Sequence, residues 1–310
     1  MAGKKATREG YGDALVELGK LHDDVYVLDA DLASATKSGV FKKAFPDRFI
    51  DCGIAEGNMM GIAAGLASCG LKPFASSFAM FAAGRAYEQV RNLIAHTHLN
   101  VKVCASHAGI SVGEDGATHQ CLEDIALMTA IPGMVVVSPS DYVETLACIK
   151  AAYEYDGPMY IRTCRYGVPI INDNEDYKFE IGKAIRLRDG KDVSIIANGL
   201  EVGFALEAAD ILAEQGISAE VINMHTIKPI DKDIVIEAAK KTGKIVTVED
   251  HSVVGGVGSA VCNVLCENYP ARVHKIGIND EFGESGSAAA LLEHYGLDGK
   301  GIAKNIAEWL

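Results

Sequence analysis

Residues 104–120, CASHAGISVGEDGATHQ, follow an apolar run at 101–105 and precede an amphipathic segment that begins near Leu122. Three glycines mark places where the backbone can bend or approach a ligand closely: Gly109, Gly113 and Gly116. The loop also carries polar and titratable side chains: His107, Ser111, Glu114, Asp115, Thr118, His119 and Gln120. This density, at the end of a buried strand, favours a small-molecule site, although a glycine-rich turn with solvated charges is the simpler alternative.

The same order of strand, loop and helix repeats along the chain. We predict strands at residues 25–29, 49–50, 73–76, 101–105, 134–138, 159–163, 192–197, 219–223, 244–249 and 272–276. We predict helices at residues 7–22 (with Thr7 as N-cap), from 56 onward, and at 77–96, 122–130, 141–155, 201–216, 231–242, 256–268, 285–295 and 300–310. Such alternation implies parallel sheets covered by helices on both faces.

A polar stretch with Pro169 interrupts this alternation and divides the chain in two. The prediction is an α/β protein with two doubly wound domains. The first covers residues 1–170 and the second covers 191–310, and a linker at 171–190 joins them.

Charge and cysteine usage narrow the class of function. The net charge is −13 and no Lys/Arg cluster is longer than a pair, which argues against nucleic-acid binding. Anionic metabolites stay possible, because a few local arginines can bind a phosphate. The eight cysteines are scattered without a CxxC pair, as in a reducing compartment. With no apolar signal core and no run of membrane-spanning length, we expect a cytoplasmic protein without membrane contact.

Glu56 opens a helix of small and apolar residues, DCGIAEGNMMGIAAGLA. It is either a first-turn carboxylate stabilised by the helix dipole or a carboxyl group held in an apolar cleft for proton exchange. Phe78 and Phe81 are three residues apart on a predicted helix. Core packing is the usual role of such a pair, and a flat wall for a heterocycle is the alternative.

Two histidines flank the opening loop, and Asp115 lies between them. His107, His119 and Asp115 together could hydrogen-bond hydroxyl groups and exchange protons near neutral pH. Arg8, Arg162 and Arg165 are candidate anion contacts, with surface ion pairing as the alternative, and we expect Arg162 to point away from the strand end. Arg165 follows a predicted strand end, where open α/β sheets place ligands.

Residues 249–261, EDHSVVGGVGSAV, contain a candidate dinucleotide-binding loop. Read from Gly256, the third fingerprint position is Val261, and the loop before the glycines is too long for a tight strand-to-helix turn. The sequence therefore predicts a glycine-rich helix start that packs near other backbone.

The combined motifs resemble those of the transketolase family. They are DCGIAEGNMMGIAAGLA at 51–67, SFAMFAAGRAYEQVR at 77–91, SHAGISVGEDGATHQ at 106–120, SPSD at 138–141 and GPMYIRTCR at 157–165. The resemblance covers the pyrimidine-binding and C-terminal domains, so it implies a thiamine diphosphate fold followed by a transketolase C-terminal domain. The implied reaction transfers a two-carbon ketol unit from a ketose phosphate to an aldose phosphate.

The resemblance also implies a role for each matching residue. Glu56 would hydrogen-bond the pyrimidine ring of thiamine diphosphate, and Phe81 would stack on that ring beside Phe78. The implied phosphate contacts are Arg8, Ser34, His107 and Arg165. Asp115 would contact a substrate hydroxyl and His119 would lie near the transferred unit, so Glu56, His107 and His119 are the expected catalytic residues.

One family feature is not found in this sequence. Transketolases bind the diphosphate and its metal through a GDG…N motif, and this chain has none. We therefore expect no metal ligands here, with Mg²⁺ or another divalent cation held by an N-terminal partner subunit in an α₂β₂ assembly. Two alternatives stay open. One is half of another thiamine diphosphate enzyme, similar to deoxyxylulose-phosphate synthase or a 2-oxoacid dehydrogenase β subunit. The other is a non-catalytic regulatory subunit.

Overall fold

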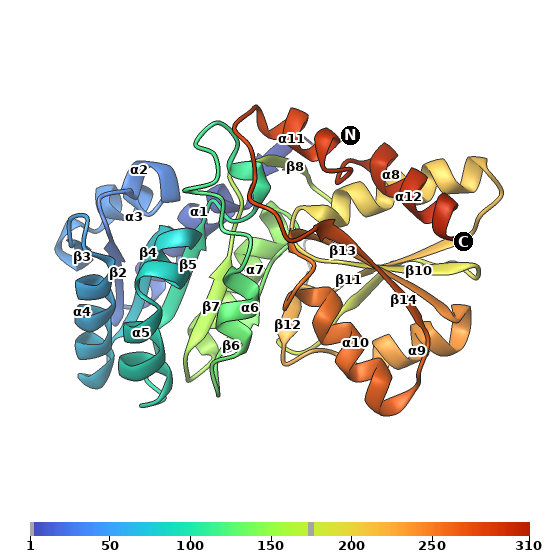
Figure 1. Cartoon of the computed structure of the whole chain (residues 1–310). Helices are drawn as coiled ribbons and strands as arrows, with labels where there is room; N and C mark the ends of the chain where they lie inside the picture. The colour runs from blue at the N-terminus through green and yellow to red at the C-terminus, as the bar shows by residue number, and fades with distance from the viewer. Residues whose placement is uncertain (1–2, 173–176) are drawn as a thin grey trace.

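The computed structural model describes residues 3–172 and 177–310 and contains two large sheets side by side (Figure 1). The first sheet has the order β12-β6-β7-β5-β4-β2-β3, and all its pairs are parallel except β12 with β6. Its strands are β2 Val25–Asp29, β3 Phe49–Asp51, β4 Lys72–Phe78, β5 Lys102–Ser106, β6 Val135–Val137, β7 Met159–Arg162 and β12 Thr226–Lys228.

Helices cover both faces of this sheet. One face carries α1 Thr7–Leu21, α3 Gly39–Ala44 and α7 Tyr142–Glu154, which enclose a core around Tyr11, Phe41 and Ile149. The other face carries α4 Glu56–Ser68, the π-helical turns η2 Met80–Arg85 and η3 Val90–Ala95, α5 Tyr87–Gln89 and α6 Asp124–Thr129. Three short helices lie in loops: α2 Ala33–Thr36, η1 Pro46–Arg48 and η4 Ile110–Val112.

The second sheet has the order β14-β13-β10-β11-β9, and only β9 runs antiparallel to its neighbour. Its strands are β9 Ile185–Arg188, β10 Val193–Ala197, β11 Ala219–Asn223, β13 Lys244–Ser252 and β14 Arg272–Ile278. Its helices are α8 Glu201–Glu214, α9 Lys232–Thr242, α10 Val257–Asn268 and α12 Gly299–Trp309, while α11 Ala288–His294 packs against η4. A small antiparallel pair joins β1 Lys4–Ala6 to β8 Gly167–Pro169.

The predicted α/β class and both parallel sheets are confirmed, and each predicted strand lies on an observed one. The linker was predicted at 171–190, but its last part is a strand: β9 (Ile185–Arg188) pairs with β11 in the second sheet. Residues 173–176 of that linker lie outside the described part of the chain. β12 was not predicted, because its three residues form a strand only by crossing to β6 of the first sheet.

The helix predicted at 77–96 is confirmed as a series of helical turns over residues 79–95, but its predicted start was wrong. Phe78 is the last residue of β4, in register with Ser106 of β5, and two π-helical turns with α5 between them follow it. Thr7 is not an N-cap: Ala6 occupies that position and the Thr7 hydroxyl hydrogen-bonds the Cys164 sulfur at 3.3 Å. Tertiary contacts overrode the local signal in both cases.

The glycine-rich start of α10 is occupied by a carboxylate of the same chain. Glu249 accepts hydrogen bonds from the amides of Val257 at 2.7 Å and Gly258 at 2.9 Å. A β-carbon on Gly256 would lie 1.8 Å from the Glu249 carboxylate, so only glycine fits there. These amides are therefore not free for a phosphate.

Among residues 3–172 and 177–310, none of the helices has both the length and the apolar character that a membrane-spanning helix needs.

Asp141 ties the start of α7 to the chain that leaves the first sheet. The buried carboxylate accepts hydrogen bonds from the amides of Glu144, Ile171 and Asn172, each at 2.7 Å. Because three buried amides would lose their acceptor, Asp141→Ala should lower the free energy of unfolding by about 3 kcal/mol, measured by urea denaturation. Exposed Asp23→Ala is the control, and a loss no larger than the control's would contradict this role.

Candidate active site

The candidate residues gather at the carboxyl ends of the parallel strands. Phe78 ends β4, His107 follows β5 and Arg165 lies three residues beyond β7. Glu56 starts α4 after β3. Parallel strands bring their carboxyl ends to one edge of a sheet, so residues far apart in sequence meet there.

An aromatic stack connects the predicted cofactor wall to the predicted phosphate contact. The Phe81 and Phe78 rings stack with centroids 6.1 Å apart, and Phe78 stacks on His107 at 3.9 Å. His119 approaches the edges of this stack, 5.3 Å from Phe81 and 6.3 Å from Phe78. The structure therefore brings together both predicted aromatic residues and both predicted histidines.

Glu56 is 1% exposed and forms an ion pair with Arg85, whose Nη1 lies 2.9 Å from the Glu56 Oε2. The Arg85 guanidinium also lies 4.5 Å above the centre of the Phe81 ring. Planar Arg85 thus makes one contact with the carboxylate and one with the aromatic face. Arg85 is not among the predicted site residues, because an arginine on an exposed helical turn is usually a surface cation.

The buried His107 ring is held by hydrogen bonds on both nitrogens. Its Nε2 lies 3.2 Å from Arg8 Nη1, and its Nδ1 lies 2.8 Å from Ser106 Oγ. A guanidinium only donates, so Nε2 accepts and the neutral ring carries its proton on Nδ1, which donates to Ser106. Its backbone φ of 57° is unusual for a residue with a side chain.

Burial, together with the positive charges of Arg8 and Arg165, lowers the pKa of His107 to about 3. The expectation that His107 exchanges protons near neutral pH was therefore wrong. The neutral ring can hydrogen-bond a ligand, while positive charge comes from the arginines. Arg8 Nη1 also donates to the Ala35 carbonyl at 2.8 Å, and its buried Nε has no hydrogen-bond partner among the described residues.

Asp115 and Arg165 lie at the exposed side of the loop. Arg165 Nη1 is 3.8 Å from the Asp115 carboxylate and 3.7 Å from that of Glu114, and it donates to the Val112 carbonyl at 3.1 Å. Both side chains of the Asp115 pair are about two-fifths exposed. These long ion pairs contribute little stability, so the groups can turn toward a ligand at small cost.

Ser34, the fourth predicted phosphate contact, makes none of the contacts described above for Arg8, His107 and Arg165. It lies on α2, within a loop that Asp29 organises by accepting hydrogen bonds from the Leu32 amide at 2.6 Å and the Thr36 hydroxyl at 2.8 Å. The Ser34 side chain is exposed and lines a separate cleft of about 340 Å³ with Lys37 and other lysines. Its neighbour Ala35, through the carbonyl, is the residue that contacts Arg8.

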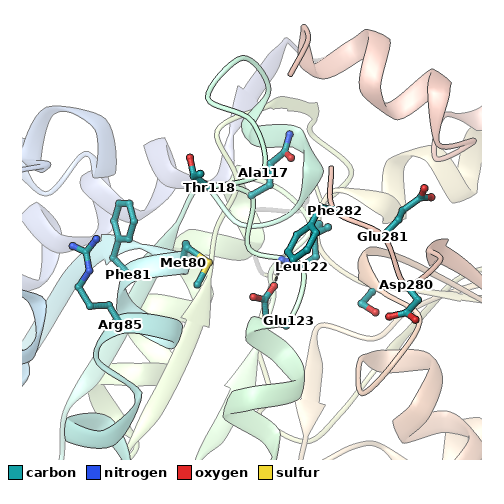
Figure 2. Close-up of a pocket in the computed structure, with 12 residues that line it drawn as sticks. Met80, Phe81, Arg85, Ala117, Thr118, Leu122, Glu123, Asp280, Glu281 and Phe282 are labelled. Carbon is teal, nitrogen blue, oxygen red and sulfur yellow. Dashed lines mark hydrogen bonds between the residues drawn. The ribbon is translucent and has the colours of Figure 1, made fainter. Parts of the chain in front are cut away.

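A cleft of about 620 Å³ opens between the two domains beside Phe81. Figure 2 shows Phe81 and Arg85 on the first-domain side and residues 280–282 on the opposite side. Phe282 is 86% exposed, which is unusual for a large apolar side chain. Residues 280–282 are not among the predicted site residues, although a phenylalanine among acidic and glycine residues after the last strand is a usable signal. Among the described residues, no group of three or more His, Cys, Asp or Glu side chains could hold a metal ion.

The Glu56–Arg85 pair can be tested by a double-mutant cycle on the purified chain. Arg85→Ala should lower the free energy of unfolding by about 1–2 kcal/mol, because the buried Glu56 carboxylate loses its cationic partner; the loss is moderate because the Arg85 side chain is half exposed. Adding Glu56→Gln should restore most of that loss, which urea unfolding measures as a coupling of about 1 kcal/mol. Exposed Arg91→Ala is the matched control, and a coupling near zero would contradict the pair.

The lowered pKa of His107 predicts a pH dependence of stability. The pKa of the His107 ring is 6.5 in the unfolded chain and about 3 in the folded chain, so the unfolded chain binds the proton first. The free energy of unfolding therefore decreases as the pH falls from 6.5 toward 3. The slope from this group approaches about 1.4 kcal/mol per pH unit. The free energy of unfolding, measured by urea denaturation, should therefore fall less in His107→Gln than in the wild type when the pH is lowered from 7.5 to 4.5. Parallel curves between pH 6.5 and 4.5 would be the contrary result.

Comparison with known proteins identifies the family. Residues 3–169 match the model of the transketolase pyrimidine-binding domain, and residues 182–302 match that of the transketolase C-terminal domain. A putative transketolase C-terminal section from Methanocaldococcus jannaschii is 54% identical over 306 residues, which cover 98% of this chain and 96% of that protein. A 6-deoxy-6-sulfo-D-fructose transketolase subunit from a Clostridium species is 44% identical, covering 96% of this chain and 92% of that protein.

A solved structure agrees with these matches. A split-gene transketolase, described as an inactive β₄ tetramer, is 51% identical to this chain and superposes with a TM-score of 0.91, covering 98% of this chain and 97% of that one. With both domains matched by family models and by relatives along nearly the whole length, the chain belongs to the transketolase family and corresponds to its C-terminal section.

Proposed function

We propose that this chain is the C-terminal subunit of a thiamine diphosphate-dependent transketolase, which transfers a two-carbon ketol unit from a ketose phosphate to an aldose phosphate. The observation that carries the proposal is the buried Glu56 carboxylate, whose ion-pair partner Arg85 lies over the face of the Phe81 ring. Transketolase family membership supports the class of reaction. Family membership does not fix the substrate, because the Clostridium relative is named for a sulfosugar, 6-deoxy-6-sulfo-D-fructose. The sugar phosphates are therefore part of the proposal.

The residues present fit the aminopyrimidine end of the cofactor. Protonated Glu56 would donate a hydrogen bond to a ring nitrogen, and the flat face of Phe81 would stack on the ring in place of the Arg85 guanidinium. When bound, thiamine diphosphate supplies a carbon nucleophile and an electron sink. Glu56 keeps the ring oriented and holds a proton at its carboxylate, and Phe78 supports Phe81 from behind.

The charged end of the cofactor calls for ligands from another chain. The sequence has no GDG…N motif, and the described residues offer no metal-binding cluster. We therefore assign the diphosphate and Mg²⁺, or another divalent cation, to an N-terminal partner subunit. A heterotetramer of two such pairs is the proposed assembly. The apolar, glycine-rich face of α4 beside Glu56 is a candidate for part of the contact.

The other end of the site suits an anionic, hydroxylated substrate. Arg8, Arg165 and neutral His107 would hold the phosphate, and the unpartnered buried Nε of Arg8 is a donor ready for it. Asp115 is exposed enough to accept a hydrogen bond from a sugar hydroxyl, and His119, whose ring meets that of Phe81, would lie near the transferred unit. Ser34 is the remaining proposed phosphate contact, and its neighbour Ala35 accepts a hydrogen bond from Arg8 through its carbonyl. Eight unpaired cysteines support the proposal of a cytoplasmic protein.

Reconstitution tests the proposal. The purified chain with thiamine diphosphate and Mg²⁺ should show no ketol transfer, and the N-terminal partner should restore it with xylulose 5-phosphate but not with pyruvate as donor. In the complex, Glu56→Gln should lower kcat at least ~100-fold, because the ring loses its proton-holding partner, while assembly measured by sedimentation is unchanged.

Exposed Glu308→Gln on α12 is the matched control and should keep the wild-type rate. Robust transfer by the chain alone would overturn the two-subunit proposal. A wild-type rate in the Glu56→Gln complex would instead favour a regulatory subunit, and turnover with pyruvate would favour a different thiamine diphosphate enzyme.

A further inference from the structure

The second domain reaches the candidate site through the end of β13. We propose that Asp250 is a positioning residue, which holds residues 107–120 (the substrate loop) in the conformation that presents their side chains to substrate. The proposal assigns a task in the reaction to the C-terminal domain. It rests on the proposed function for its kinetic part, while its structural part stands alone.

The Asp250 carboxylate is bound directly to the backbone of the substrate loop. Its Oδ1 accepts a hydrogen bond from the Ile110 amide at 2.6 Å, and its Oδ2 lies 3.4 Å from the Ser111 amide. A β-carbon on Gly109, where φ is +81°, would lie 2.2 Å from that carboxylate. The loop therefore runs directly over a buried anion, and its glycine is required there by both conformation and space.

Asp250 is itself fixed from the first domain. Its carbonyl oxygen accepts a hydrogen bond from Arg162 Nη2 at 2.6 Å, and Arg162 Nε donates to the Asp124 carboxylate at 2.9 Å. Arg162 is the last residue of β7, three residues before Arg165. The strand that leads to a proposed phosphate contact thus also anchors the residue that shapes the loop.

The far end of the loop is attached to the same domain. The Ser252 amide donates to the Leu122 carbonyl at 2.8 Å, and Gln120 Nε2 donates to the Glu284 carbonyl at 2.9 Å. Asp115 and His119 lie between these attachments and the one at Asp250. Because the loop is hydrogen-bonded at both ends, the positions of the Asp115 and His119 side chains are restricted. A displacement of such a side chain by about 1 Å can lower the reaction rate ~100-fold.

A purely structural role for Asp250 makes a different prediction from a positioning role. General destabilisation would loosen the whole chain and weaken cofactor and substrate binding together. A positioning role affects the substrate loop and leaves the Glu56 region, on the other side of the aromatic stack, unchanged. Local exchange and separate binding measurements therefore distinguish the two.

The first test uses the full chain alone. Asp250→Ala and the milder Asp250→Asn, which keeps one acceptor oxygen, should speed amide hydrogen exchange in peptides covering 106–113 by about tenfold and about threefold. Exchange in peptides covering α4 should stay at the wild-type rate. Exposed Glu293→Gln on α11 is the matched control. Wild-type exchange at 106–113 in Asp250→Asn, or equal acceleration across the chain, would overturn the proposal.

The second test uses the complex with the N-terminal partner. Asp250→Asn should raise KM for the ketose phosphate about tenfold, with the thiamine diphosphate Kd measured by calorimetry within about twofold of wild type. A cofactor Kd that rises as much as KM would overturn the positioning role. If the wild-type complex transfers no ketol unit, the proposed function fails, and the exchange experiment still decides whether Asp250 holds the loop.

Discussion

The buried ion pair between Arg162 and Asp124 is the interaction on which the arrangement of the two domains depends. The two side chains are 4% and 0% exposed, and Arg162 also donates to the backbone of Asp250 across the domain boundary. Burial alone would lower the pKa of Arg162, but the nearby Asp124 and Asp250 carboxylates more than offset it and raise that pKa. Removing one partner would leave a buried charge unpaired, at a cost of about 3–5 kcal/mol.

The candidate site follows from this joint between the domains. The first sheet supplies a row of strand ends with Phe78, His107 and Arg165, and the second sheet supplies β13, whose end meets the loop that carries most of the polar groups. The cleft beside Phe81 accordingly has walls from both domains. Half of the proposed chemistry lies in this chain: Glu56 and the aromatic stack suit the pyrimidine end of the proposed cofactor, while the described residues hold no cluster of His, Cys, Asp or Glu for its metal ion.

Local errors in the sequence-based prediction share one cause. Residues 77–96 have helical composition, yet Phe78 belongs to β4 because pairing with β5 extends the strand. Thr7 looks like a cap, yet its hydroxyl turns to Cys164, 157 residues away. β12 and β9 have little signal of their own and exist because neighbouring strands offer free edges. His107 looked like a group that titrates near neutral pH until burial beside two arginines lowered its pKa to about 3.

The sequence by itself determined the α/β class, the two parallel sheets, the position of Glu56 at a helix start and the aromatic pair near it, because periodicity and local motifs are properties of neighbouring residues. Only the tertiary structure decided which groups meet: Arg85 with Glu56, Arg8 with His107, and Asp250 with the loop. The physical reason is that contacts between residues tens to more than a hundred positions apart depend on how the strands are ordered and how the two sheets pack, and burial in turn sets the charge that each group carries.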